Sequence, residues 1–382
     1  MRILHTSDWH LGKRLFKLDR SLEHEKFFDW LIETLISENI DVLLMAGDVF
    51  DTPTPPHHAL EMFYNFLHRL SIETKVQSYF IAGNHDSGLL IEAPARLLTP
   101  HRVKVWGKLS DNPEDHWIEI KAKDEVIDLC AIPFFRSHEL LPQGEGDALL
   151  ALKKYIDKKS DHAKILMLHH LAGMYEAAGS EQVIALSGVD SIPSELIGDF
   201  DYVALGHIHK PQKIGAKIFY SGSPIPLRFS ETLAKSVVII ESTKEGLTSK
   251  IHPIPVMRAM ISIKADEENF REKIKNLKVD SPLTPMVEVQ LTLASPRIGL
   301  IDEIKSLLDK KEMELLSYQA SYTSEEKRES RGSALFELST TDLFKEFYAT
   351  KYPLSPEIPE DLMQDFTSLL EKVKNASHTP QG

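Results

Sequence analysis

Residues 42–48 read Val-Leu-Leu-Met-Ala-Gly-Asp, an apolar run that ends at a glycine and an aspartate. The run has the length and composition of a buried strand, and Gly47 begins the turn that follows it. The same order recurs in residues 79–86, Tyr-Phe-Ile-Ala-Gly-Asn-His-Asp, and in residues 202–209, Tyr-Val-Ala-Leu-Gly-His-Ile-His. This repeated pattern predicts strands that deliver polar side chains to the loops at one edge of a sheet.

Apolar residues at helical spacing lie between these strands, for example over residues 22–36 and 57–70. Strands with apolar interiors that alternate with helices predict an α/β core, in which helices cover both faces of a sheet. The pattern changes near Pro253 and Pro255, where short strands and charged helices begin. We therefore expect three parts: a core over 1–256, a small α+β domain over 257–335 and C-terminal helices over 336–382.

The composition restricts the class of protein. The chain has 382 residues, 42% hydrophobic and 26% charged, which is the balance of a folded globular protein and excludes a disordered or fibrous chain. No apolar run approaches the ~20 residues of a membrane-spanning helix. The single cysteine, Cys130, cannot form an internal disulfide, so a reducing cytoplasm is expected. The net charge of −13 argues at first sight against a nucleic-acid partner, because Lys and Arg drive phosphate binding.

The residues that follow the predicted strands share one chemistry. They are carboxylates, imidazoles and one amide, the groups that hold first-row divalent metals. Each alone has an ordinary explanation, as a turn former or as one of 17 histidines, but their joint placement after separate strands predicts one metal site. The candidates are Asp8, His10, Asp48, Asn84, His85, His169, His170, His207 and His209.

These motifs resemble those of the calcineurin-like metallophosphoesterase superfamily. The matching strings are Asp8-Trp9-His10, Gly47-Asp48-Val49-Phe50-Asp51, Gly83-Asn84-His85-Asp86, His170 and Gly206-His207-Ile208-His209. Three longer strings narrow the resemblance to the SbcD family, the nuclease subunits of bacterial SbcCD complexes: residues 5–12 (HTSDWHLG), 204–209 (ALGHIH) and 220–227 (YSGSPIPL). The resemblance implies a core of β-sheets flanked by helices, an α+β capping domain and C-terminal helices.

The resemblance also implies two divalent metal ions, with Mn²⁺ expected. Asp48 would bridge the two ions. Asp8, His10 and His209 would complete one site, and Asn84, His170 and His207 would complete the other. Such a pair of ions suits in-line displacement at a phosphodiester.

The remaining site residues receive supporting roles by the same resemblance. His85 is expected to contact the scissile phosphate, where it stabilises the transition state or protonates the leaving 3′ oxygen. The match of His170-Leu171 to the family makes His170 the ligand and His169 its neighbour. Asp51 and Asp86 are either groups that orient histidines or turn residues.

A basic stretch follows the first of these loops. Lys13, Arg14, Lys17 and Arg20 form either a patch that contacts DNA phosphates without reading sequence or a solvated helix face. The sequence has no base-reading motif, so a preference for DNA ends and hairpins over particular sequences is expected.

The C-terminal helices place large apolar residues at helical spacing, either as core or as a surface for a partner. By resemblance the partner is SbcC, an ATPase subunit, and the assembly contains a homodimer of this chain within a heterotetramer. The expected setting is the cytoplasm, in association with the nucleoid.

The predicted function is therefore that of a metal-dependent DNA nuclease subunit in repair, recombination and replication. By resemblance it acts as an exonuclease on double-stranded ends and as an endonuclease on single strands and hairpins. The alternatives are a stand-alone metallophosphatase or cyclic-nucleotide phosphodiesterase, and a non-catalytic scaffold. For a nuclease, the net acidity predicts weak, salt-sensitive DNA binding by this chain alone. The partner is then expected to supply most of the affinity for DNA.

Overall fold

The computed structural model describes residues 1–141, 146–176, 191–231, 233–295, 297, 299–322, 341, 344–345, 347–348 and 358–376. These residues belong to two compact units, one of 1–291 with 298–320 and the other of 292–297 with 321–382. The predicted boundaries at 256 and 335 stay a prediction. Of the predicted C-terminal helices, α12 (Glu360–Ala376) is described, and most of 336–359 lies outside the described residues.

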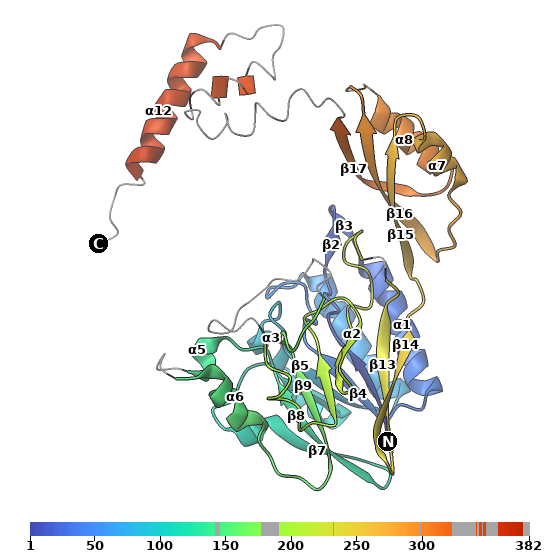
Figure 1. Ribbon diagram of the computed structural model, residues 1–382, viewed down its shortest axis with the longest axis vertical. Helices are drawn as coiled ribbons and strands as arrows, with labels where there is room; N and C mark the ends of the chain where they lie inside the picture. Colours follow the sequence, from blue (N-terminus) through green and yellow to red (C-terminus); the bar gives the residue numbers. More distant parts are fainter. Residues whose placement is uncertain are drawn as a thin grey trace. The chain divides into compact units, whose positions relative to one another are not determined.

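Two six-stranded sheets form the core (Figure 1). The first sheet has the order β14 (Gly246–Pro253), β13 (Ser236–Thr243), β1 (Arg2–Thr6), β4 (Val42–Ala46), β5 (Gln77–Ile81) and β6 (Val103–Trp106). The second has the order β11 (Gln212–Ile214), β12 (Ile218–Tyr220), β10 (Tyr202–Leu205), β9 (Ala163–Leu168), β8 (Glu125–Ile132) and β7 (Trp117–Ala122).

The two sheets pack against each other, and helices cover their outer faces. Val42, Leu44 and Met167 belong to the apolar cluster between the sheets, whereas Leu43 and Met45 face the helices. This alternation follows from the two-residue period of a strand. The predicted fold class is confirmed, but the expectation that helices cover both faces of one sheet is wrong, because each sheet has its other face against a second sheet.

The helices of the core flank the sheets. Aromatic and aliphatic side chains of α1 and α2 pack on the first sheet, and those of α6 pack on the second. The helical segments are α1 (Ser21–Ser37), α2 (His57–Glu73), α3 (Gly88–Glu92), α4 (Ala95–Leu98), η1 (Thr99–His101), η2 (Pro113–His116), α5 (Ser137–Leu140) and α6 (Ala148–Ile156).

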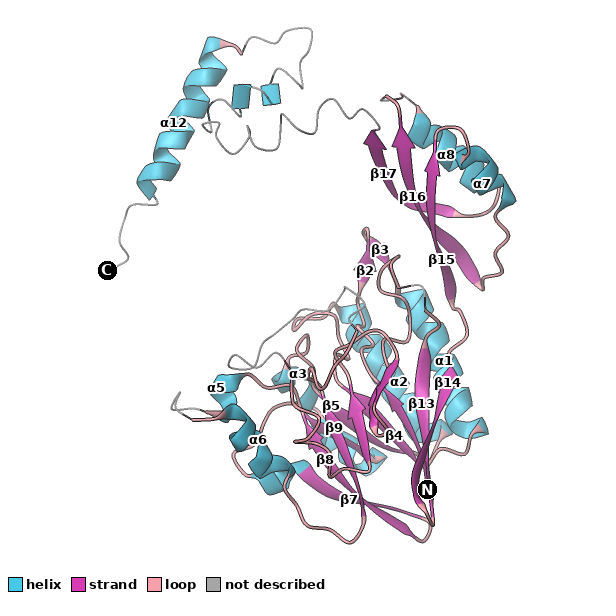
Figure 2. Ribbon diagram, in the orientation of Figure 1, coloured by secondary structure: helices cyan, strands magenta, loops and turns pink. Residues whose placement is uncertain are grey.

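A three-stranded sheet with two helices follows the core in sequence. Its strands are β15 (Arg258–Asp266), β16 (Leu283–Leu293) and β17 (Glu314–Tyr322), with β16 in the middle. Figure 2 shows α7 (Phe270–Asn276) and α8 (Leu300–Asp309) on one side of this sheet. Both helices bury apolar residues, including Phe270 and Ile304. This is the predicted α+β fold of the capping domain.

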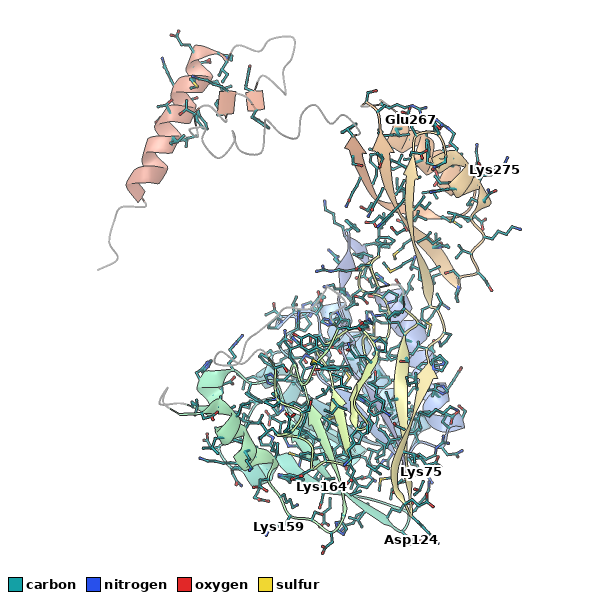
Figure 3. All side chains as sticks on the ribbon, in the orientation of Figure 1. Lys75, Asp124, Lys159, Lys164, Glu267 and Lys275 are labelled. Carbon is teal, nitrogen blue, oxygen red and sulfur yellow. The ribbon has the colours of Figure 1, made fainter. Side chains whose placement is uncertain are left out.

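The interior of the core is apolar. Cys130 is fully buried among apolar side chains, where it acts as a small hydrophobic residue. Trp9 is likewise buried, with its ring against those of Phe28 and Phe66. Side chains fill the space between the sheets and helices, and charged groups such as Lys159 lie outside (Figure 3). Within the described residues, no helix has the length and apolar character needed to cross a bilayer.

The sheet topology brings the predicted site together. In the first sheet β1, β4 and β5 are parallel, and in the second β9 and β10 are parallel. Parallel strands present their carboxyl ends at the same edge. The loops after these five strands therefore meet, three from the first sheet and two from the second.

The packing between the sheets is expected to determine the stability of the core. Met167 is fully buried there, so Met167→Ala should lower the free energy of unfolding by about 2–5 kcal/mol through lost burial and a residual cavity. Urea unfolding followed by circular dichroism measures this change. Exposed Lys159 provides the control, because Lys159→Ala should change the value by less than about 0.5 kcal/mol. Equal effects of the two substitutions would contradict the sheet-on-sheet core.

Candidate metal centre

Several of the predicted ligands have an unusual backbone conformation. The φ angles of Asp8, His10, Asp48 and His207 are 54°, 50°, 57° and 89°. This left-handed region is unfavourable for residues other than glycine, by roughly 1–3 kcal/mol each. Neighbouring loops hold these residues there, since the amide of Asp8 donates to the carbonyl of Gly47 (2.9 Å) and that of His10 to the carbonyl of Asp48 (3.1 Å). Such strain clusters at functional sites.

The buried carboxylate of Asp48 lies at the middle of the centre. Its Oδ1 accepts a hydrogen bond from the backbone amide of His85 (2.9 Å). Its Oδ2 lies 3.5 Å from Nε2 of His10 and 3.3 Å from Nε2 of His169. One oxygen therefore faces histidines that come from different sheets.

One group of ligands gathers on the His10 side. Nε2 of His10 lies 3.0 Å from Nε2 of His209, and both rings have potential ligand atoms within 4.8 Å of a carboxylate oxygen of Asp8. Asp8 is held in turn, because its Oδ1 accepts a hydrogen bond from the amide of His207 (2.9 Å). The structure thus brings Asp8, His10 and His209 together, as the family resemblance implied.

A second group gathers on the other side of Asp48. Oδ1 of Asn84 lies 3.1 Å from Nε2 of His169 and 2.9 Å from Nδ1 of His207. The amide oxygen of Asn84 is therefore placed between two imidazoles. Asn84 and His207 meet as predicted, but the third member of this group is His169.

His170, the predicted ligand, lies elsewhere. Its Nε2 accepts a hydrogen bond from the amide of Phe135 (3.3 Å), its ring stacks on Phe134, and burial holds its pKa well below the usual value. His169 instead donates from Nδ1 to the carbonyl of Ala46 (2.7 Å), which leaves Nε2 for the centre. The positions of His169 and His170 are thus the reverse of those expected.

The alternation of β9 explains this reversal. Ile165 and Met167 face the first sheet, whereas Leu166 and Leu168 face the helices. Successive side chains of an extended chain point to opposite faces, so His169 continues the row of Met167. The alternation of side chains along β9 can be counted in the sequence, and continuing that count to residue 169 could have identified His169 as the ligand.

Two glycines permit the close approach of these loops. A Cβ atom on Gly83 would lie 2.1 Å from Oδ1 of Asp48, and one on Gly206 would lie 2.0 Å from the carbonyl oxygen of Ala46. Both distances are shorter than any tolerated contact. The glycines that precede Asn84 and His207 therefore have a packing role as well as a turn role.

The two predicted supporting carboxylates act differently. Oδ1 of Asp51 lies 3.3 Å from Nδ1 of His10 and accepts a hydrogen bond from Nζ of Lys13 (2.9 Å), so Asp51 orients a candidate ligand. Asp86 accepts hydrogen bonds from three backbone amides, which ties two loops of the centre together. The three donors are Val49, Phe50 and Gly83.

His85 lies beside the centre and is partly exposed. Its Nδ1 lies 2.8 Å from the carbonyl oxygen of Asp51, and its ring contacts that of His10. Nδ1 of His85 donates its proton to this carbonyl in a hydrogen bond. Nε2 is therefore the ring nitrogen that can face a substrate.

The charges of the centre favour a cation. Burial opposes ionisation of Asp48, but His169 and His10 hold the pKa of this carboxyl below its usual value. Burial opposes protonation of His169, yet the carboxylates of Asp48 and Asp8 raise its pKa to about 9. Burial holds the pKa of His209 well below its usual value. Ionised carboxylates beside imidazoles and an amide oxygen form a donor set that fits divalent metal ions.

The predicted DNA-contacting residues do not form one patch. Arg14 and Lys17 are exposed, and Lys13 is paired with Asp51. Arg20 is 1% exposed, contacts the carboxylate of Glu23 and donates to the carbonyl of Pro226. The prediction of a DNA contact by Arg20 is wrong, because its guanidinium is buried in the protein.

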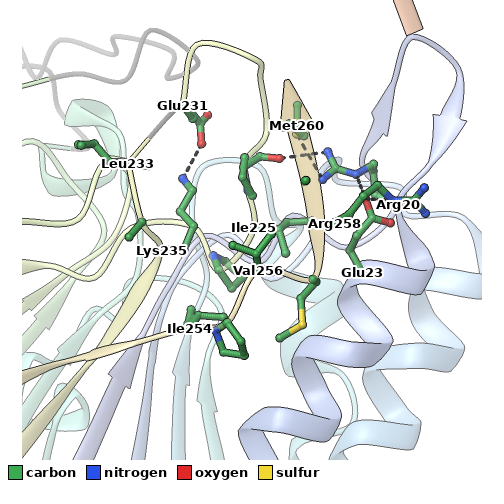
Figure 4. A pocket seen from close by; sticks show the side chains of 16 residues that line it. Arg20, Glu23, Ile225, Glu231, Leu233, Lys235, Ile254, Val256, Arg258 and Met260 are labelled. Atoms are coloured by element: carbon green, nitrogen blue, oxygen red, sulfur yellow. Dashed lines mark hydrogen bonds and ion pairs between the residues drawn. The ribbon is translucent and has the colours of Figure 1, made fainter. Parts of the chain in front are cut away.

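A cavity of about 410 Å³ has a lining separate from the candidate ligands (Figure 4). Its wall includes Ile225, Val256 and Met260, with the charged side chains of Glu231 and Lys235 at one side. None of the predicted metal ligands lines it. The metal centre is thus distinct from this cavity.

Comparison with known proteins identifies the family. Residues 1–211 match the family model of calcineurin-like phosphoesterases, and residues 256–352 match the model described as type 5 capsule protein repressor C-terminal domain.

Three similar proteins are named as the SbcD component of the nuclease SbcCD. That of Escherichia coli strain K12 is 28% identical over 372 residues, which cover 90% of this chain and 92% of that protein. That of Rhodobacter capsulatus is 33% identical over 69% of this chain and 72% of its own length, and that of Bacillus subtilis strain 168 is 35% identical over 63% and 66%. The chain belongs to the calcineurin-like phosphoesterases and, within them, to the SbcD family of nucleases.

Proposed function

We propose that this nuclease hydrolyses phosphodiester bonds of DNA with two divalent metal ions, and that Mn²⁺ is the ion it uses. The single observation that carries the proposal is the placement of Asp48, whose Oδ2 faces Nε2 of His10 on one side and Nε2 of His169 on the other. A carboxylate between two imidazole groups is suited to bridging two ions.

The proposed ligands form two sets that share Asp48. One set adds Asp8, His10 and His209, and the other adds Asn84, His169 and His207. Ions held by these residues would supply stabilisation of the attacking and leaving oxygens in an in-line displacement. The contacts of His169 support its place here, because the Nδ1–H donated to Ala46 fixes the tautomer that leaves Nε2 for a metal.

His85 is the proposed catalytic residue. The carbonyl of Asp51 holds its Nδ1, and the ring is partly exposed beside the centre. In this position Nε2 can stabilise the charge that develops on the phosphate or give its proton to the leaving 3′ oxygen.

The substrates and partner are proposed from the family and from the charge of the chain. Double-stranded ends, single strands and hairpins are the proposed DNA substrates, with roles in repair, recombination and replication at the nucleoid. Exposed Arg14 and Lys17 are the proposed phosphate contacts. A chain with a net charge of −13 holds DNA weakly by itself, so an SbcC-type ATPase is proposed to supply most of the affinity.

The C-terminal helix is proposed to dock on that ATPase. Leu362 and Leu369 of α12 are 40% and 62% exposed, and their seven-residue spacing places them on one face of the helix. The working assembly is proposed to contain a homodimer of this chain within a heterotetramer.

The assignment of His169, and not His170, as the metal ligand can be tested with a matched pair of substitutions. His169→Leu should weaken Mn²⁺ binding by more than the roughly 10–100-fold loss seen when a residue that only supports a ligand is changed. His170→Leu should keep Mn²⁺ affinity, since the imidazole it removes packs on Phe134 away from the centre. Isothermal titration calorimetry measures both affinities, and circular dichroism checks the fold. Loss of Mn²⁺ binding in His170→Leu alone would contradict the assignment.

The role of His85 can be tested on DNA. With saturating Mn²⁺, His85→Gln should slow cleavage of a hairpin DNA by roughly 10²–10⁴-fold, the contribution typical of a general acid or base. Its Mn²⁺ affinity should match that of the wild type, because the proposed ligands are unchanged.

A phosphomonoester and a cyclic nucleotide serve as comparison substrates in the same assay. Equal rates for wild type and His85→Gln would remove the role of His85. A wild type that cleaves no DNA, alone or with SbcC, would refute the nuclease proposal itself.

A further inference from the structure

The sequence motif at 220–227 and the residues Glu231 and Lys235 that follow it contact the metal centre at two points, although no chemistry was assigned to this motif. At the first point, Oγ of Ser221 lies 2.7 Å from Oγ of Ser7, and Ser7 donates to the carboxylate of Asp8. At the second point, Glu231 and Lys235 reach His209. The motif therefore packs against one half of the centre.

The second contact is made by a buried lysine. Lys235 is 7% exposed, and its ammonium group donates to the carbonyl of His209 (3.1 Å), Oγ of Ser223 (2.8 Å) and Oε2 of Glu231 (2.5 Å). These three bonds use all three donors of an ammonium group. Figure 4 shows the Glu231–Lys235 pair at the wall of the cavity.

Glu231 faces the imidazole of the same histidine. Its Oε1 lies 3.9 Å from Nδ1 of His209, while Nε2 of His209 is 3.0 Å from Nε2 of His10. Its Oε2 also accepts a hydrogen bond from the amide of Leu227 (3.1 Å). Glu231 thus lies on the side of the ring opposite the metal centre, and Lys235 holds the main chain of His209.

Two other imidazoles of the centre also face a polar group with the outer nitrogen, at the shorter distances of 2.7 Å for His169 and 3.3 Å for His10. Nδ1 of His169 faces the carbonyl of Ala46, and Nδ1 of His10 faces Asp51. A group that accepts from the outer nitrogen fixes the tautomer and makes the inner nitrogen a better ligand. Stability alone does not explain the burial of Glu231 and Lys235, because apolar residues of similar volume are often as stable as a buried ion pair.

We propose that Glu231 and Lys235 are positioning residues that orient His209 as a metal ligand. The proposal rests on the proposed two-metal function, in which His209 binds one ion. The pair acts through His209 and has no contact with substrate in this role.

The test separates positioning from folding. Lys235→Met removes the ammonium from beside the buried carboxylate of Glu231, so it should lower the melting temperature. The double variant Glu231→Gln/Lys235→Met removes both charges at nearly constant volume and should melt close to the wild type. Exposed Lys244 provides the control, Lys244→Met, which should match the wild type in every measurement.

Mn²⁺ binding to the full-length chain is measured by calorimetry and by electron paramagnetic resonance. The wild type should bind two ions, and the double variant should bind one of them about 10–100-fold more weakly. Hairpin cleavage by the double variant should need correspondingly more Mn²⁺ and return close to the wild-type rate at saturating Mn²⁺. A purely structural role would not shift this metal dependence once the melting temperature is restored.

Two results would overturn the proposal, and they can be told apart. Wild-type affinity for both ions in the double variant would overturn positioning and leave the two-metal function intact. Failure of the wild type to bind two ions would overturn the two-metal function and positioning together. If the double variant does not fold, Glu231→Gln, which keeps Lys235, provides the same comparison of the two affinities.

Discussion

The buried carboxylate of Asp48 connects the loops of the two sheets of the core. Its Oδ2 faces His10, from the loop after β1 in the first sheet, and His169, which follows β9 in the second. Its Oδ1 accepts the amide of His85. A buried carboxylate needs compensating partners, and here they come from loops of both sheets. The packing of the sheets, the left-handed backbone of the loops and the glycines beside them all serve to bring these partners within reach.

The surroundings of the centre show how its histidines are held. The outer nitrogens face different groups: a carboxylate of Asp51 at 3.3 Å for His10, the main-chain carbonyl of Ala46 at 2.7 Å for His169 and, at 3.9 Å, the carboxylate of Glu231 for His209. Lys13 donates to Asp51, and Lys235 donates to Glu231. Such support keeps the inner nitrogens directed at the metal centre.

The net negative charge of this chain limits how it can bind DNA. A net charge of −13 opposes general attraction to DNA, and burial removes Arg20 from the residues that the sequence offered for phosphate contact. Of these residues, Arg14 and Lys17 are exposed, and they are the proposed phosphate contacts. In the proposed function, so few phosphate contacts give weak DNA binding, and the partner subunit supplies most of the affinity.

Much of the fold and most of the candidate site could be predicted from the sequence. Strands such as β4, with Gly47 and Asp48 behind it, are recognisable because a buried strand and its turn are local features of composition and periodicity. The carboxylates, imidazoles and amide that follow these strands are also local features of the sequence, and they indicated a metal site. The family resemblance added the pairing of ligands.

Only the tertiary structure decided how these pieces face one another. A buried strand has the same apolar sequence whether a helix or a second sheet covers it. The sequence pattern therefore could not predict that two sheets pack against each other. The choice between His169 and His170 depends on which face of the second sheet meets the first. The burial of Arg20 and the contacts of Glu231 and Lys235 with His209 join residues far apart in the chain. Local periodicity determines which residues share a face of a strand or helix, but what that face packs against is decided by contacts between distant segments.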